Sequence, residues 1–379
     1  MPPVLDPVCI DFAGAAGEAA IKQLCQRVLP GWQSALEADM QLSKISGGIS
    51  NLLVKVSPGP ATGLRPVAVK VFGDKTELLI DRAAELQVLV TLNQAGFGAQ
   101  VLAVFENGRI EEFLTATTLT PADMAHPTYV PRIARILRRL HEVTTGGQQP
   151  QLFEGIRAWL HTARGLSFPD ATKQARFQQL DMDAMGAELD QLQQMTDTVA
   201  SPVVFSHNDL LSGNILVLQK DGVDISDPRQ VDPQGPLQLI DFEYSGPGFR
   251  GFDWGNHFNE YAGFDCDYSR YPDRAAQALF FGHYMAEDAA VKEMGQPPGA
   301  ESQDVPSVLS DAQLDKLCAE ADLFALVSHT FWGIWALVQA RYSPIDFDYL
   351  EYSAMRWREY HRRKPDTFTA AKQAFLPDT

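Results

Sequence analysis

Residues 207–214 read HNDLLSGN, a segment of the form H-x-D-x4-N in which Asp209 precedes Asn214 by five residues. The apolar run Ile215–Leu218 follows at once and predicts a short strand that anchors this segment as a loop. From such a loop one carboxylate can face an attacking hydroxyl, while a neutral amide oxygen faces a metal ion. The spacing therefore favours Asp209 as a catalytic base and Asn214 as a metal ligand.

A second motif follows downstream, where the apolar run 237–240 predicts a strand that ends in Asp241-Phe242-Glu243. Protein kinases place H-R-D-L-x-x-x-N and D-F-G in this order, for a catalytic base and for magnesium ligands. Either aspartate taken alone is as readily explained by the capping of a turn, but the ordered pair is far more specific. Asp209, Asn214 and Asp241 are therefore predicted as catalytic residues, with Asn214 and Asp241 as the ligands of Mg²⁺.

The part of the chain before residue 114 shows the pattern of a small α/β lobe. Its clearest strand is 66–72 (PVAVKVF), in which valines alternate along the segment. Helical spacing of apolar residues predicts a helix over 78–95, and Asn107-Gly108 predicts a hairpin turn. The other expected strands cover residues 39–45, 51–57, 101–105 and 109–114.

This lobe holds the predicted nucleotide site. The segment 46–51 (SGGISN) lies between two expected strands, and its glycines would let backbone N–H groups approach phosphate oxygens. Lys70 resembles the strand lysine of kinases, and Glu85 on the next helix is expected to pair with it. Backbone groups of residues 111–114 are expected to contact adenine. The predicted nucleotide-binding residues are Ser46, Gly47, Gly48, Ser50, Asn51, Lys70, Glu85, Glu112 and Leu114.

After residue 114 the pattern becomes mainly helical. Helices are predicted over 129–143 and 183–196, and the polar stretches 219–236 and 296–304 are predicted to be a loop and an insert. The sequence therefore indicates an α+β protein with an N-terminal nucleotide-binding lobe (1–114) and a C-terminal catalytic and substrate-binding lobe (115–379). Ligands favour interfaces between such lobes.

Composition excludes several classes of function. The formal charge of the 379 residues is −17, from 31 basic and 48 acidic side chains, which argues against binding to nucleic acid or to anionic membranes. The four cysteines are far apart and form no C-x-x-C pair, so neither a disulfide framework nor a zinc site is expected.

Targeting signals are not expected. The N-terminal segment lacks the basic n-region of a secretory signal, and the apolar segment 323–340 carries polar residues and predicts a buried helix rather than a stable membrane insertion. A cytoplasmic location is therefore predicted. The oligomeric state stays open, a homodimer included.

Two long strings give the chain a family resemblance. Residues 240–261 read IDFEYSGPGFRGFDWGNHFNEY and are similar to the pattern IDFEY…NYRGFD…NHFxEW of the choline/ethanolamine kinases. Residues 328–360 read SHTFWGIWALVQARYSPIDFDYLEYSAMRWREY and resemble that family's C-terminal block. The resemblance covers almost everything from about Leu42 to Tyr360. Aminoglycoside-type phosphotransferases, the alternative from the same fold, lack both strings.

The resemblance implies a two-lobed, protein-kinase-like fold with an antiparallel sheet in the small lobe and a large, mainly helical second lobe. It implies transfer of the ATP γ-phosphoryl group, with Mg²⁺, to choline or ethanolamine. The departures from the family pattern are Lys70, where arginine is frequent, and Gly248, Phe249 and Tyr261 in the longest string. These departures concern the phosphate and alcohol sites. The three catalytic positions are unchanged, which argues against the alternative that the chain is a catalytically inactive, ligand-binding pseudokinase.

The choice of amino alcohol rests on the cation to be bound. Aromatic faces suit the quaternary ammonium of choline, whereas the three N–H donors of ethanolamine suit carboxylates and carbonyls. The residues predicted to bind the substrate are Asp209, Tyr244, Glu260, Asp265, Trp332, Trp335 and Tyr352.

The catalytic loop HNDLLSGN and the segments 73–82, 259–272 and 339–349 resemble ethanolamine kinases more than choline kinases. The sequence therefore favours ethanolamine, with choline as the alternative. Phosphoethanolamine would be the product, and the resemblance implies the first step of the CDP-ethanolamine route to phosphatidylethanolamine.

Overall fold

The computed structural model describes residues 4–11, 14–45, 51–72, 82–144, 149–294, 308–343 and 345–376. The chain divides into two compact units. Met1–Thr117 and Leu216–Glu243 form the first unit, and Thr118–Ile215 and Tyr244–Thr379 form the second. The first unit thus combines the N-terminal part of the chain with a later segment that carries the predicted Asp241 motif.

A six-stranded sheet organises the first unit, in the order β1-β5-β6-β4-β3-β2. Its strands are β1 (Val4–Asp6), β2 (Gln41–Ile45), β3 (Asn51–Ser57), β4 (Val67–Phe72), β5 (Val101–Phe105) and β6 (Gly108–Glu112). The expected antiparallel pairing holds from β5 to β2, whereas β1 pairs with β5 in parallel. The sheet is therefore mixed. The sequence did not predict β1, because a three-residue strand beside Pro7 is too short to show any alternation.

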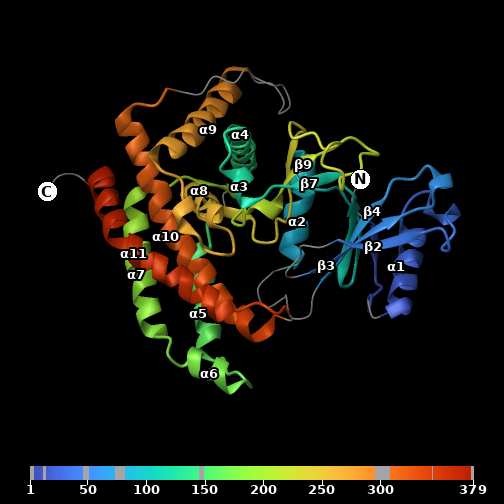
Figure 1. Ribbon diagram of the computed structural model, residues 1–379, viewed down its shortest axis with the longest axis horizontal. Helices are drawn as coiled ribbons and strands as arrows, with labels where there is room; N and C mark the ends of the chain where they lie inside the picture. Colours follow the sequence, from blue (N-terminus) through green and yellow to red (C-terminus); the bar gives the residue numbers. More distant parts are fainter. Residues whose placement is uncertain are drawn as a thin grey trace. The chain divides into compact units, whose positions relative to one another are not determined.

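One face of the sheet is covered by α1 (Gly14–Val28), as Figure 1 shows. Apolar side chains on one side of this helix share a core with the valines of β3 and β4. The core members from these elements are Ile21, Leu24, Cys25, Val28, Val54, Val56, Val67, Val69 and Val71. The valines are β-branched and favour the pleated backbone, so local propensity and burial agree in this part of the unit.

The helix expected over 78–95 is α2 (Arg82–Gln94), and residues 78–81 lie outside the described chain. The two predicted strands that flank the polar loop are also confirmed, as β9 (Ile215–Leu218) and β10 (Leu237–Leu239). They form a three-stranded sheet with β7 (Ala116–Thr118), in the order β10-β9-β7. Between β9 and β10 the chain makes turns without helix or strand, as the sequence predicts.

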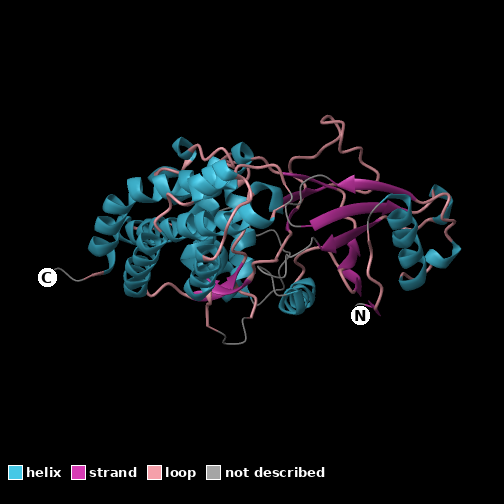
Figure 2. Cartoon of the chain, turned by 90° about the horizontal axis from the view of Figure 1, so that it is seen from below, coloured by secondary structure: helices cyan, strands magenta, loops and turns pink. Residues whose placement is uncertain are grey.

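The second unit is built almost entirely of helices (Figure 2). Its helices are α3 (Pro121–Met124), α4 (Val130–His141), α5 (Leu152–Arg164), α6 (Ala171–Phe177), α7 (Met182–Val199), α8 (Arg250–Asn259), α9 (Arg274–Met294), α10 (Asp311–Tyr342) and α11 (Tyr349–Phe375). The predictions over 129–143 and 183–196 are confirmed as α4 and α7. One antiparallel pair, β8 (Val203–Ser206) with β11 (Gly246–Phe249), lies in this unit.

Helix α10 forms the core of the second unit, where it contacts α5, α7, α8, α9 and α11. Among the described helices it alone is long and apolar enough to cross a membrane, yet 94% of its most apolar window is buried inside the protein. The prediction of a buried helix over 323–340 is thus confirmed. Helix α8 reaches α10 closely because Gly255 has no side chain: a Cβ there would lie 2.3 Å from the backbone nitrogen of Ala325.

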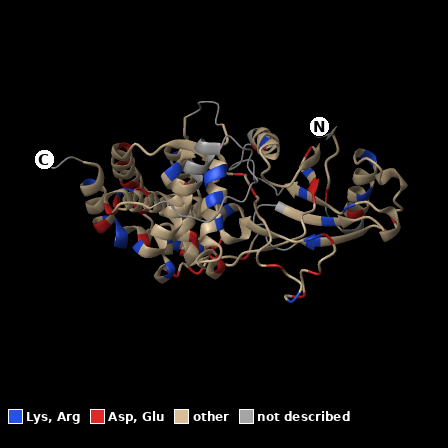
Figure 3. Cartoon of the chain, turned by 90° about the horizontal axis from the view of Figure 1, so that it is seen from above, with Lys and Arg blue, Asp and Glu red and all other residues tan. Residues whose placement is uncertain are grey.

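Charged side chains of both signs are interspersed along the ribbon (Figure 3). The acidic excess of the sequence is therefore not collected on one element, and the charges that matter for function have to be found as local clusters. One such cluster lies in the first unit, around Lys70.

Candidate active site

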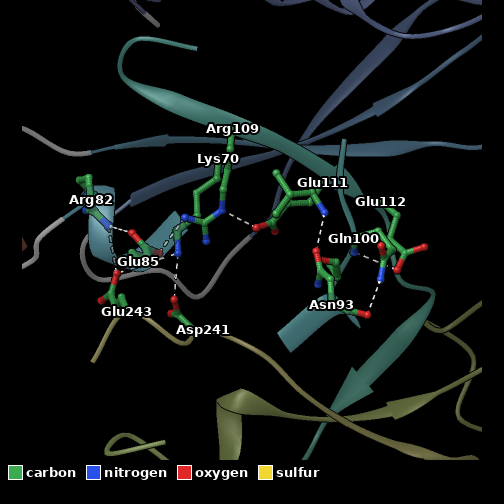
Figure 4. Close-up of polar contacts among 12 residues, drawn as sticks. Lys70, Arg82, Glu85, Asn93, Gln100, Arg109, Glu111, Glu112, Asp241 and Glu243 are labelled. Atoms are coloured by element: carbon green, nitrogen blue, oxygen red, sulfur yellow. Dashed lines mark hydrogen bonds and ion pairs between the residues drawn. The ribbon is translucent and has the colours of Figure 1, made fainter. Parts of the chain in front are cut away.

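In the first unit, Lys70 on β4 forms an ion pair with Asp241 (Figure 4). The Lys70 Nζ atom lies 2.8 Å from Asp241 Oδ1 and 4.0 Å from Glu243 Oε2. The Lys70 side chain is only 9% exposed, whereas the Asp241 side chain is 30% exposed. The two motifs that the sequence singled out in this unit, AVKVF and IDFE, are therefore in direct contact.

Glu85 on α2 has other partners than the sequence suggested. Its carboxylate binds Arg109 Nη1 at 2.7 Å on one oxygen and Arg82 Nη1 at 2.7 Å on the other. Glu85 still acts on Lys70 electrostatically and raises the pKa of its ammonium, but in the described chain its direct ion pairs are with the two arginines. Arg109 also binds Glu111, so this guanidinium links α2 to β6.

The register of the sheet explains why this cluster needs so many acids. Lys70 on β4 lies directly opposite Arg109 on β6, and like charges at such positions repel. Burial and the neighbouring Arg109 lower the pKa of Lys70, but the carboxylates of Asp241, Glu243 and Glu85 together outweigh them, and the pKa lies above its ordinary value. Burial and the neighbouring Asp241 raise the pKa of Glu243. The ammonium therefore stays charged although it is buried.

Asp241 owes its orientation to the backbone. Its φ angle is 64°, in the left-handed region that residues other than glycine seldom adopt. The next residue, Phe242, is 1% exposed, and its ring lies against Gly98, where an added Cβ would come within 3.2 Å of it. The buried ring holds the turn while the carboxylate keeps its exposure, an arrangement typical of residues held for function.

The remaining predicted nucleotide residues are less constrained by the structure. Ser46, Gly47, Gly48 and Ser50 lie outside the described residues, and Asn51 begins β3. Glu112 ends β6 and exchanges hydrogen bonds with Gln100, since its Oε1 accepts from Gln100 N at 3.0 Å. Leu114 follows in the half-buried link to β7. Their contact with a nucleotide stays a prediction.

Replacement of Glu85 by Gln should destabilise the protein by about 3 kcal/mol, because the buried Arg109 and Arg82 lose a shared counter-charge. Urea unfolding of both proteins measures the change. The matched control is Glu18→Gln at an exposed position of α1, for which no change is expected. An E85Q protein as stable as the wild type would contradict the structural role given to this carboxylate.

In the second unit, the predicted catalytic loop follows β8. Asn208 has a φ angle of 65°, and its side-chain Nδ2 donates to the Tyr244 carbonyl at 2.8 Å. Asn214 closes the 3-10 turn Ser212–Asn214 and donates from Nδ2 to the Asp209 carbonyl at 2.8 Å and to Asp209 Oδ2 at 3.1 Å. The predicted base and amide are thus brought together in one loop.

Side chains of helix α8 bind the backbone of this loop. Asp253 accepts from the backbone N–H of His207 at 2.7 Å and of Asn208 at 2.6 Å. His257 Nδ1 lies 3.1 Å from the Leu210 carbonyl. All three contacts are made by residues within two positions of Asp209, so α8 fixes the backbone on both sides of the predicted base.

Asp253 is itself held by His141 of α4, whose Nε2 lies 3.0 Å away while its Nδ1 lies 2.7 Å from the Tyr284 hydroxyl. Burial lowers the pKa of His141, although Asp253 acts in the opposite direction. A neutral imidazole that donates to Asp253 and accepts from Tyr284 satisfies both contacts. The catalytic loop is therefore supported by a fully buried polar network.

The predicted aromatic residues form one cluster. The Tyr244 and Trp332 rings lie 5.5 Å apart and the Trp332 and Trp335 rings 5.2 Å apart, both edge to face. Trp335 donates from Nε1 to the Tyr244 hydroxyl at 2.9 Å. These three residues come from α10 and from the segment after Asp241-Phe242-Glu243, and the structure brings them together; their contact with a substrate stays a prediction.

Glu260 and Tyr352 meet at Arg356. Arg356 Nη1 lies 3.3 Å from Glu260 Oε1, and the guanidinium lies 5.7 Å from the centre of the Tyr352 ring. Burial raises the pKa of Tyr352, Arg356 opposes this rise, and Glu260 and Asp209 add to it. Tyr352 therefore lies within electrostatic reach of two of the three predicted substrate carboxylates, Glu260 and Asp209. Asp265, by contrast, is exposed on the loop after α8.

The sequence profile of the choline/ethanolamine kinases matches residues 42–361. The chain belongs to the choline/ethanolamine kinase family. The prediction of this family from the two long strings is therefore confirmed.

Relatives of this family cover nearly the whole chain. A probable ethanolamine kinase of Arabidopsis thaliana is 39% identical over 351 residues, 92% of this chain and 86% of the relative. A probable ethanolamine kinase A of Dictyostelium discoideum is 35% identical and covers 89% of both chains. The solved structure of Plasmodium vivax ethanolamine kinase has a TM-score of 0.73 at 24% identity, over 92% of this chain and 90% of that one. This last likeness supports the kinase-like fold.

For a choline/ethanolamine kinase the donor atoms fit Mg²⁺. Asn214 uses its Nδ2 atom for the hydrogen bonds to Asp209. In the described part of the chain these bonds leave its Oδ1 atom available to a metal ion. Asp241 offers a partly exposed carboxylate. Both atoms are hard oxygen donors of the kind that magnesium prefers.

One departure from the pattern of choline/ethanolamine kinases has a structural reason. Gly248 lies on β11 opposite Val204 of β8, and a Cβ there would lie 2.5 Å from Ser206 Oγ and 3.3 Å from Asn208 Oδ1. The larger residue of the family pattern would therefore need a shift of β8 or of Asn208. The departure lies at the support of the catalytic loop rather than in the phosphate site.

Proposed function

We propose that this chain phosphorylates the hydroxyl group of ethanolamine with ATP and Mg²⁺, giving phosphoethanolamine and ADP. The observation that carries the proposal is the Asp209–Asn214 contact inside a loop whose backbone Asp253 holds, in a member of the choline/ethanolamine kinase family. The names of the similar relatives, which are ethanolamine kinases, support ethanolamine as the acceptor.

Asp209 is proposed to orient the substrate hydroxyl and to accept its proton as the oxygen attacks the γ-phosphorus. The Asn214 amide supports this role, because its Nδ2 donates to the Asp209 carboxylate and restricts its rotation. General-base catalysis of this type contributes about a hundredfold or more to the rate. The buried position of Asp209, which is 8% exposed, limits access of bulk water to the transferred proton.

Asn214 and Asp241 are proposed as the ligands of Mg²⁺, which neutralises the charge of the phosphate oxygens when it is bound. Lys70 is proposed to neutralise further phosphate charge, for which its raised pKa keeps it protonated. Lysine does so as a point charge, without the planar fork of the arginine that is frequent at this position in the family. The segment 46–51 is proposed to cover the phosphates.

The ammonium of ethanolamine is proposed to be bound by Tyr244, Glu260, Asp265, Trp332, Trp335 and Tyr352. A primary ammonium has three N–H donors that need acceptors, and the Glu260 carboxylate supplies one beside Tyr352. Arg356 offsets part of the charge of Glu260, which weakens the attraction of this carboxylate for an ammonium group. Choline has no N–H donor and would form no hydrogen bond with this carboxylate.

The kcat/KM for ethanolamine should therefore exceed that for choline by at least about tenfold, because a site built for donors rejects analogues that lack them. A coupled ADP-release assay with the purified protein measures both values. N-methyl- and N,N-dimethylethanolamine serve as graded controls and should fall between the two. A higher kcat/KM for choline would reject the assignment to ethanolamine.

The reaction would supply phosphoethanolamine for the CDP-ethanolamine route to phosphatidylethanolamine. We propose that it takes place in the cytoplasm. The acidic sequence, with a formal charge of −17, supports this location because it opposes attachment to anionic membrane surfaces.

A further inference from the structure

A buried chain of hydrogen bonds runs from the catalytic loop to the predicted substrate residues, and Asn256 of α8 is at its centre. Asn256 is fully buried. Its Nδ2 atom donates to the Asn208 carbonyl at 3.3 Å, in the residue directly before Asp209. Its Oδ1 atom accepts from Trp332 Nε1 at 2.7 Å and from Ser328 Oγ at 2.8 Å.

The chain continues beyond Ser328. Arg356 Nη2 donates to Ser328 Oγ at 2.8 Å, and Arg356 Nη1 lies 3.3 Å from Glu260 Oε1. Each of these side chains is at least nine-tenths buried. In such surroundings a lost hydrogen bond is not replaced by water, so each bond fixes geometry more strongly than it would at the surface.

The two ends of the Asn256 amide therefore serve different parts of the site. Two donors on Oδ1 determine which way the amide points, and Nδ2 is then directed at the loop carbonyl. The Trp332 ring is held by its own hydrogen bond to Asn256 Oδ1. We propose that Asn256 is a positioning residue that keeps the Trp332 ring and the Asn208–Asp209 backbone in one fixed relation, so that a bound amino alcohol meets Asp209 in the reactive geometry.

This inference rests on the proposed function, because it takes Trp332 as part of the substrate site and Asp209 as the base. It goes beyond that function by assigning a positioning role to a residue that is not among the predicted substrate or metal residues. A displacement of about 1 Å at a reacting group can cost up to a hundredfold in rate, so a single amide can matter for turnover without contacting the substrate.

The same helix provides a matched control. Asn259 is also fully buried on α8, and its Nδ2 donates to the Ala325 carbonyl at 2.9 Å. The Asn259 bond ends on α10 instead of on the catalytic loop. Asn256→Leu and Asn259→Leu are nearly isosteric changes that each remove a buried hydrogen bond to a backbone carbonyl, and both should lower Tm.

Only N256L should lower kcat at saturating ATP and ethanolamine, by at least about tenfold, whereas N259L should keep the wild-type kcat. Equal kcat values for the two folded variants would overturn the inference, because the role of Asn256 would then be structural alone. If N256L does not fold, Ser328→Ala tests the same amide, since it removes one donor to Oδ1. S328A should then lower kcat, and an unchanged kcat would overturn the inference.

The wild-type protein separates this inference from the proposed function. Absence of turnover with both ethanolamine and choline in the wild type would remove the proposed function. Normal wild-type turnover with no difference between the α8 variants would remove only the role of Asn256.

Discussion

Replacement of Asp209 by Asn should lower kcat for ethanolamine phosphorylation by at least about a hundredfold, because an amide cannot accept the proton of the attacking hydroxyl. The change is isosteric, and the Asn214 bond to the residue 209 carbonyl, at 2.8 Å, does not depend on the side chain. The Tm and the KM for ATP should therefore change little. Steady-state kinetics with a thermal melt measures all three quantities.

The control for Asp209 is Asp190→Asn, an exposed carboxylate on α7 that pairs with Arg157. Its kcat should equal that of the wild type. A D209N protein with near-wild-type turnover would remove Asp209 from the role of base and would leave the loop geometry without a catalytic explanation.

Replacement of Asp241 by Asn should lower kcat by at least about a hundredfold, the loss expected when charge stabilisation of the transition state is removed. The concentration of Mg²⁺ needed for half-maximal rate should rise, because an anionic ligand has been replaced by a neutral one. Lys70 loses its nearest counter-charge at 2.8 Å, so its pKa should fall from its raised value. A magnesium titration of the rate at fixed ATP measures the effect.

The matched control for Asp241 is Asp221→Asn, in the loop between β9 and β10. Asp221 pairs with Arg65 through side chains that are 75% and 85% exposed, and exposed pairs contribute little. Its magnesium dependence should be that of the wild type. If D241N also kept the wild-type magnesium dependence and kcat, the assignment of Asp241 as a metal ligand would be wrong.

Local pattern was sufficient for much of the fold. β4 was predicted because its valines alternate within an apolar run, and α4 because its apolar residues recur at steps of three and four. The helices α1 and α5 were not predicted. α5 lacks a capping side chain at Gln151, and α1 is rich in alanine and glycine, so neither has a strong start signal.

The site could be predicted where its residues lie close together in the sequence. Asp209 and Asn214 share one loop, so their spacing alone indicates that they meet. The partner of Glu85 could not be predicted in the same way, because Arg109 reaches it through the β4–β6 register, which pairs strands distant in sequence. The expected attraction between Lys70 and Glu85 is present, but the direct ion pairs of Glu85 in the described chain are with Arg82 and Arg109.

The support of the catalytic loop was missed for a related reason. Asp253 and Asn256 lie in the string RGFDWGN, which the sequence marked only as part of a family pattern. Their bonds end on backbone atoms of residues 207 and 208, and a sequence does not show which backbone groups need partners. The signal available in the sequence is the set of polar residues interleaved with aromatic ones in this string. The structure shows that the helix is buried, and buried polar groups need partners.

The most direct test of the account is the product formed by the purified wild-type protein with ATP, Mg²⁺ and ethanolamine, followed by phosphorus NMR. If the protein is an ethanolamine kinase, the ATP γ-phosphate signal is replaced by a phosphomonoester signal that matches phosphoethanolamine, in equal amount to the ADP released. Formation of ADP with inorganic phosphate alone, or no ethanolamine-dependent loss of ATP, would contradict this assignment.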